Sequence, residues 1–203
     1  IQAAQYVAVA VENTMQHEQL LATQSALEKE HRQLRLLIAV SQAITSHLTL
    51  NTLLPSIDEC LKQLCGQSLT ALWVPASEPG WLRTYGGLYS DIQTNDQEFR
   101  LLINDSPSGE AFRTRRTVRL RFEELQRLTT EPARKLIEMG AKSFCAVPLL
   151  LQDKAVGVLS LIGLNPDAFP EDLTTLLEQA AKPIAIAVTH AESYRAVSYT
   201  HLR

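Results

Sequence analysis

The sequence predicts an α+β domain in which a mostly antiparallel sheet is covered by helices. Two almost continuously apolar runs, residues 143–151 and 155–164, flank the short polar connection 152–154, as expected for paired central strands. Shorter strand patterns precede this pair, and helical apolar spacing occupies both ends of the chain.

Residues 2–11 and residues 179–188 match at an offset of 177, with six of ten positions identical. A tandem repeat whose unit is a whole domain explains the match, and a chance similarity between Ala-rich helices is the alternative. The repeat predicts that residues 1–33 hold the end of a preceding domain and a connecting helix. Because the chain also starts at Ile1, we expect it to be a fragment of a larger protein.

The connecting segment, residues 12–35, is polar and favours helix, with no Gly or Pro. Leu20, Leu27 and Leu34 recur every seven residues, but Gln24 and His31 occupy the other positions of the seam. The pattern indicates either a short coiled coil or a solvated helix. Both alternatives predict a stiff rod between domains.

The second unit, residues 34–195, starts with two helical patterns. The first runs from Leu34 to about His47, and the second can be capped by Asn51 or Thr52 and ends at Gly66. The period then becomes strand-like. Strands are predicted over residues 68–74, 81–85, 99–103 and 117–121.

Two short helices are predicted among these strands. Ser106 or Ser108 can cap the first, whose buried side would be Ala111 and Phe112. The second covers residues 132–139 and stops at Gly140.

The last helix starts after Pro170, and Pro183 within it predicts a kink. Its apolar stripe ends at Val188. Residues 196–203 lack the stripe and resemble translated adapter sequence, so we exclude them from the domain as a non-native tail.

Composition argues against several classes of protein. The chain has 19 basic and 22 acidic residues, so its charge of −3 provides no general attraction to nucleic acid or to an anionic membrane. No apolar run approaches the roughly 18 residues of a membrane span. Cys60, Cys65 and Cys145 show no CxxC spacing, which argues against disulfides and zinc and favours a cytoplasmic location.

The ordered motifs of the second unit resemble a GAF domain. They are the stretch 108–114, Gly140 to Ser143, Val147-Pro148-Leu149, residues 157–161, and the closing segment 169–187. The resemblance implies a regulatory module that senses a small molecule and relays its ligand state through flanking helices, working as a homodimer through these helices. It implies no direct contact with nucleic acid or membrane.

The arrangement is similar to the tandem GAF sensor region of sigma-54-dependent transcriptional regulators of the formate-hydrogenlyase-activator type. A sensor of a histidine kinase or diguanylate cyclase and a purely structural dimerisation module are the alternatives. Pro166 and Leu173 depart from the family's cyclic-nucleotide signature, and no Cys stands beside a His as in bilin-binding members. The sequence therefore does not identify a cofactor.

Catalytic and metal sites are not indicated. The five histidines are scattered, and no HExxH, GxSxG or paired-carboxylate motif occurs. We therefore expect no enzymatic activity and no metal site. Cys60 and Cys65 fall on a predicted helix, which argues against a reductase of the methionine-sulfoxide type.

A ligand is expected between the sheet and residues 86–139. Arg119 and Arg121 lie on one face of their predicted strand and could hold a carboxylate or phosphate, unless they are paired at the sheet edge. Ser108 lies at a predicted helix start, where an anion can bind. The remaining candidate ligand-binding residues are Trp81, Phe144 and Cys145, and Trp73 could line the same pocket. For each of these four residues we favour a place in the core over a ligand contact.

Overall fold

The computed structural model describes residues 14–28, 30–31, 34, 68–85 and 99–200, and the chain divides into two units, Ile1–Leu36 and Leu37–Arg203. In the first unit the described residues are helical, which confirms the predicted helix there, and Leu20, Leu27 and Leu34 are exposed. Several predicted segments lie outside the described residues. They are the repeated segment 2–11, the two helices predicted between residues 34 and 64 apart from Leu34 itself, and residues 86–98, the first part of the segment expected to contact a ligand.

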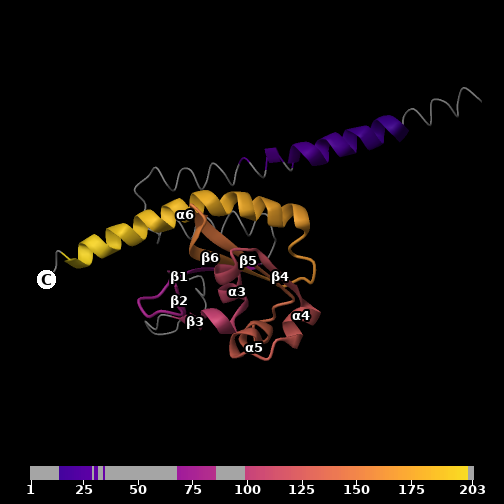
Figure 1. Ribbon diagram of the computed structural model, residues 1–203. Helices are drawn as coiled ribbons and strands as arrows, with labels where there is room; N and C mark the ends of the chain where they lie inside the picture. The colour runs from indigo at the N-terminus through magenta and orange to yellow at the C-terminus, as the bar shows by residue number, and fades with distance from the viewer. Residues whose placement is uncertain (1–13, 29, 32–33, 35–67, 86–98, 201–203) are drawn as a thin grey trace, which may run out of the picture. The chain divides into compact units, whose positions relative to one another are not determined.

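The described strands of the second unit form a six-stranded antiparallel sheet in the order β3-β2-β1-β6-β5-β4 (Figure 1). Their bounds are Ser68–Pro75 (β1), Trp81–Thr84 (β2), Arg100–Leu102 (β3), Val118–Arg121 (β4), Ser143–Leu151 (β5) and Lys154–Gly163 (β6). The predicted hairpin is confirmed as the inner pair β5 and β6, which runs from Ser143 opposite Gly163 to Leu151 opposite Lys154. The predicted α+β class is therefore confirmed.

Helices cover both faces of this sheet. The long α6 (Glu171–Thr200) packs on β5 and β6, whereas α3 (Pro107–Thr114), α4 (Phe122–Arg127) and α5 (Glu131–Glu138) lie on the opposite side (Figure 1). The sequence did not predict α4, because six residues with one buried side chain, Leu125, are too short to show a helical repeat.

The C-terminal helix α6 is longer than its apolar stripe. The helix packs on β5 and β6, and its buried residues are Leu177, Ala180, Ala181, Ile184, Ala185, Ala187 and Val188. The kink predicted at Pro183 does not interrupt α6. The helix also includes residues 196–200 of the excluded tail, because backbone hydrogen bonds within a helix do not require an apolar stripe.

Side chains alternate between two faces of the sheet, which we name the α6 face and the α3 face after the helices that cover them. Arg83 and Cys145 belong to the α6 face, and Trp73, Phe144 and Ser160 to the α3 face. On the α3 face, small residues meet across three strands: Ser160 lies opposite Ala71 and Ala146. This row of small side chains lets α3 approach the sheet closely.

Candidate functional site

The start of α3 is held against the middle of the sheet. Ser106 is the residue before the helix, and its Oγ accepts a hydrogen bond of 3.0 Å from the Gly109 N–H. Ser108, the alternative cap, is also buried, but its Oγ lies 2.9 Å from Ser160 Oγ. Ser108 therefore ties α3 to β6.

Trp73 is the unusual polar group on the α3 face. It lies on β1 between Val158 of β6 and Thr84 of β2, and it is 4% exposed. Its indole Nε1 is buried and has no hydrogen-bond acceptor in the part of the chain that the structure describes. An unsatisfied buried donor costs about 1–3 kcal/mol, so an acceptor delivered by a ligand would be stabilised there.

Apart from Ser160 and Thr84, the described side chains around Trp73 on the α3 face are apolar. Phe144 pairs with Leu120 of β4 and Ile162 of β6, and it is 2% exposed. Residues of α3, α4 and α5 and of the segment before α3 complete this cluster, among them Ala111, Phe112, Leu125 and Leu136. The prediction that Ala111 lies on the buried side of this helix is confirmed.

The six candidate residues from the sequence do not line one site. Ser108 and Phe144 belong to the α3 side, whereas the other four, Trp81, Cys145, Arg119 and Arg121, belong to the α6 face. Neighbours in a strand must point to opposite faces, so Phe144 and Cys145 cannot share a pocket. The same alternation that places Arg119 and Arg121 on one face of β4 places Phe144 and Cys145 on opposite faces of β5.

The two strand arginines lie at the sheet edge. Both are exposed, and Arg119 Nη1 donates to the carbonyl oxygen of Phe169 at 3.3 Å. The backbone N–H of Arg121 donates to Glu124 Oε2 at 2.8 Å. The contact of the Arg119 guanidinium favours the edge interpretation for Arg119, whereas the Arg121 contact is made by its backbone.

An open groove of about 750 Å³ lies where the β5–β6 turn approaches α6. Arg115, Arg116 and Lys182 line it, and none of the six candidates does. Two contacts cross its walls: Arg115 Nη1 donates to the Asp153 carbonyl oxygen at 3.1 Å, and the Thr117 hydroxyl donates to Glu178 Oε1 at 2.5 Å. These contacts join the end of α3 to the turn and the start of β4 to α6.

Cys145 is fully buried on the α6 face, which places its thiol away from α3 to α5. Cys60 and Cys65 lie outside the described residues. Among the described residues there is no group of three or more His, Cys, Asp or Glu side chains suited to a metal ion.

A hydrogen bond from Lys135, at 2.8 Å, lowers the pKa of exposed Glu131 at the start of α5. No described helix has the length and apolar character needed to cross a membrane.

Comparison with known proteins identifies one family. The family model of the GAF domain matches residues 48–189. No curated protein sequence matches the chain significantly.

Solved structures agree with this match. The GAF domain of an Acinetobacter phosphoenolpyruvate-protein phosphotransferase is 17% identical, with a TM-score of 0.64 over 79% of this chain and 95% of that one. The GAF domain of a Bacillus halodurans two-component sensor histidine kinase is 21% identical, with a TM-score of 0.61 over 72% and 97%. A free methionine-R-sulfoxide reductase from Neisseria meningitidis, solved with its substrate, is 15% identical, with a TM-score of 0.63 over 82% and 93%. At these identities the similarities show the fold.

Proposed function

The chain belongs to the GAF family, and we propose that its second unit is a non-catalytic regulatory module that binds a small molecule on the α3 face and relays this state through α6. The buried indole N–H of Trp73, which lacks an acceptor among the described residues, is the observation that carries the proposal. A ligand with a carboxylate or carbonyl oxygen would satisfy it. A carboxylate is also the group that Arg119 and Arg121 were predicted to hold, but these arginines lie on the α6 face and would not contact a ligand at Trp73.

The sheet provides the physical connection between ligand and output. Strands β5 and β6 contact α3 on one face and α6 on the other. A ligand that changes how α3 to α5 pack on the sheet would therefore shift the strands that support α6. It can change the output only if it binds two arrangements of α6 with different affinities.

The test uses the two tryptophans as separate reporters, since the chain contains only Trp73 and Trp81. In protein labelled at the indole nitrogen, a library of small carboxylates and carbonyl compounds is screened by NMR. We expect a binding compound to shift the Trp73 N–H resonance and leave the Trp81 resonance unchanged. Trp73→Phe should weaken this compound about tenfold, as expected for one lost hydrogen bond, whereas the control Trp81→Phe should retain its affinity.

The proposed site would be contradicted if the compounds had the same affinity for Trp73→Phe as for the unmodified protein. If no compound shifts the Trp73 resonance, the structural dimerisation module becomes the better interpretation. That alternative requires a pocket filled by the protein's own side chains, with Trp73, Trp81 and Phe144 packed into it. Trp73 and Phe144 are buried on the α3 face, whereas Trp81 lies on the α6 face.

For the whole protein, we propose the sensor region of a sigma-54-dependent transcriptional regulator in the cytoplasm. The repeat of residues 2–11 at 179–188 supports a tandem arrangement. A histidine kinase sensor is the alternative, and the Bacillus halodurans structure gives an example of this domain in such a protein. The full-length gene sequence would distinguish a regulator with an ATPase domain from a kinase.

The first unit is proposed to pair with a second copy of itself. Leu20, Leu27 and Leu34 are exposed on a helix at the spacing of a coiled-coil seam. Leu27→Lys should weaken dimerisation at least tenfold in sedimentation equilibrium, because two charges would meet in the seam. The control Ser25→Lys places the same charge off the seam and should leave dimerisation unchanged. A monomeric unmodified chain, or equal loss in both variants, would refute this pairing.

A further inference from the structure

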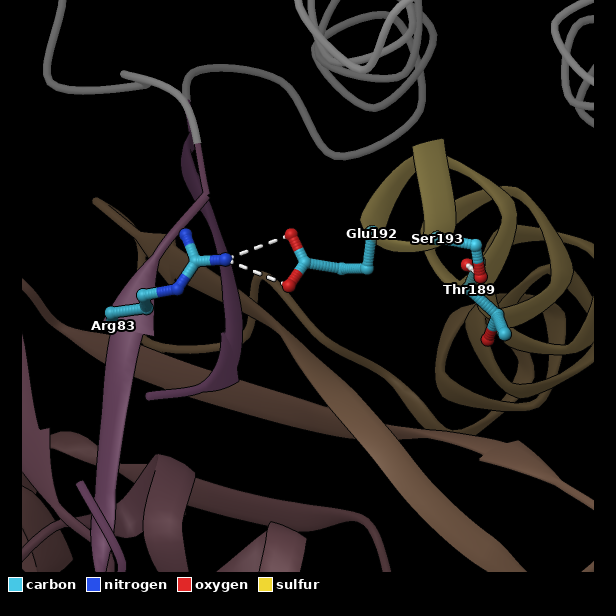
Figure 2. A network of polar contacts seen from close by, with 4 residues as sticks. All are labelled: Arg83, Thr189, Glu192 and Ser193. Carbon is cyan, nitrogen blue, oxygen red and sulfur yellow. Dashed lines mark hydrogen bonds and ion pairs between the residues drawn. The ribbon is translucent and has the colours of Figure 1, made fainter. Parts of the chain in front are cut away.

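An ion pair joins β2 to the far part of α6. Arg83 Nη2 lies 2.8 Å from both carboxylate oxygens of Glu192, although the residues are 109 positions apart in the chain (Figure 2). The Arg83 side chain is 10% exposed and that of Glu192 is 35% exposed. The guanidinium carbon also lies 5.2 Å from the centre of the Tyr85 ring. Partial burial and charge-assisted hydrogen bonding make this contact stronger than a surface ion pair.

The pair lies beyond the apolar contacts of α6. Val188 is the last residue of the helix whose side chain is both described and buried, since none of the side chains described after it, Thr189 to Ser193, is buried. The hydroxyls of Thr189 and Ser193 donate to carbonyl oxygens within α6, at Ala185 and Thr189. Figure 2 shows Glu192 alone of these three reaching across to β2. Among the described side chains, the ion pair therefore marks the last attachment of α6 to the sheet.

Strand β2 contacts both layers through adjacent residues. Thr84 lies opposite Trp73, beside the proposed ligand position, whereas Arg83 points to α6. A displacement of β2 by a few tenths of an ångström on one face would change the donor–acceptor distances on the other, where hydrogen bonds depend steeply on geometry.

We propose that Arg83 and Glu192 form a latch that holds residues 189–200 of α6 on the sheet, and that movement of β2 opens it. The closed latch is a property of the fold alone. Only its opening by a ligand rests on the proposed function. In the open state the first part of α6 stays packed through Leu177 to Val188, and residues 189–200 are released from the sheet.

The experiment measures amide hydrogen exchange in the whole chain. Glu192→Ala removes the carboxylate and keeps a good helix former, so helix propensity does not fall. We expect amides of residues 189–200 to exchange about tenfold faster, as expected for a lost charge-assisted bond, while amides of β5 and β6 keep their rates. The matched control is Glu78→Ala, which removes the partner of Arg100 on neighbouring β3, an exposed pair at 3.6 Å, and should change nothing in α6.

A second pair of variants separates the latch from a general loss of stability. Arg83→Glu should release residues 189–200 like Glu192→Ala, and adding Glu192→Arg should restore slow exchange by reversing the pair. Unchanged exchange in Glu192→Ala, or no recovery in the reversed pair while the fold stays intact, would overturn the latch. Failure of the ligand screen would leave these results unaffected, so the two proposals fail separately.

Discussion

Gly109→Ala is expected to lower the free energy of unfolding by about 3 kcal/mol. A Cβ at position 109 would lie 2.1 Å from the carbonyl oxygen of Ile103 and 2.5 Å from its Cα, and backbone atoms cannot rotate away as a side chain can. The helix cannot easily retreat, because Ser106 caps it and Ser108 ties it to Ser160. The melting temperature should fall by about 10 °C in calorimetry.

The neighbouring substitution Glu110→Ala provides the control, since Glu110 is exposed on the same helix. It should change stability by less than about 0.5 kcal/mol. Alanine also has a better helix propensity than glycine by about 1 kcal/mol, so the steric cost must exceed the net loss that is measured. A melting temperature unchanged by Gly109→Ala would mean that α3 does not contact the segment at Ile103.

The close approach at Gly109 explains one motif that carries the family resemblance, and Gly157 explains another. A Cβ at Gly157 would lie 2.6 Å from the Trp73 carbonyl oxygen on β1. Both glycines have no positive φ and serve instead to let two backbone segments meet. The sequence shows a glycine at each position but not the segment that it approaches. Gly109 meets Ile103, six residues earlier, and Gly157 meets Trp73, more than 80 residues earlier, and only the fold shows these contacts.

The sheet was most predictable where local signals agree. The runs 143–151 and 155–164 are apolar on both faces and are separated by a turn, so pattern and turn chemistry both indicate the hairpin. Arg83 and Glu192 were not predictable, because a charged residue in a short strand and one on a long helix give no signal that they meet. Trp73 could have been placed opposite Thr84 only once the register was known.

Phe144→Ala is expected to have the largest effect, a loss of about 4 kcal/mol in urea unfolding. Phe144 is 2% exposed and packs between Leu120 and Ile162, so its removal leaves a cavity in the α3-face cluster that backbone on both sides prevents from closing. The volume-conserving control Phe144→Leu should lose less than half as much.

This measurement also separates two roles that the sequence left open for Phe144. A side chain that lines an open ligand pocket packs against few neighbours, so its truncation would cost about 1 kcal/mol or less. A core side chain costs several times more, and the cavity it leaves should bind a small apolar probe such as benzene, which raises the melting temperature of Phe144→Ala alone. A small loss of unfolding free energy without a benzene effect would mean that Phe144 lines a ligand site. A large loss with a benzene effect would leave Trp73 as the polar contact for a ligand on this face.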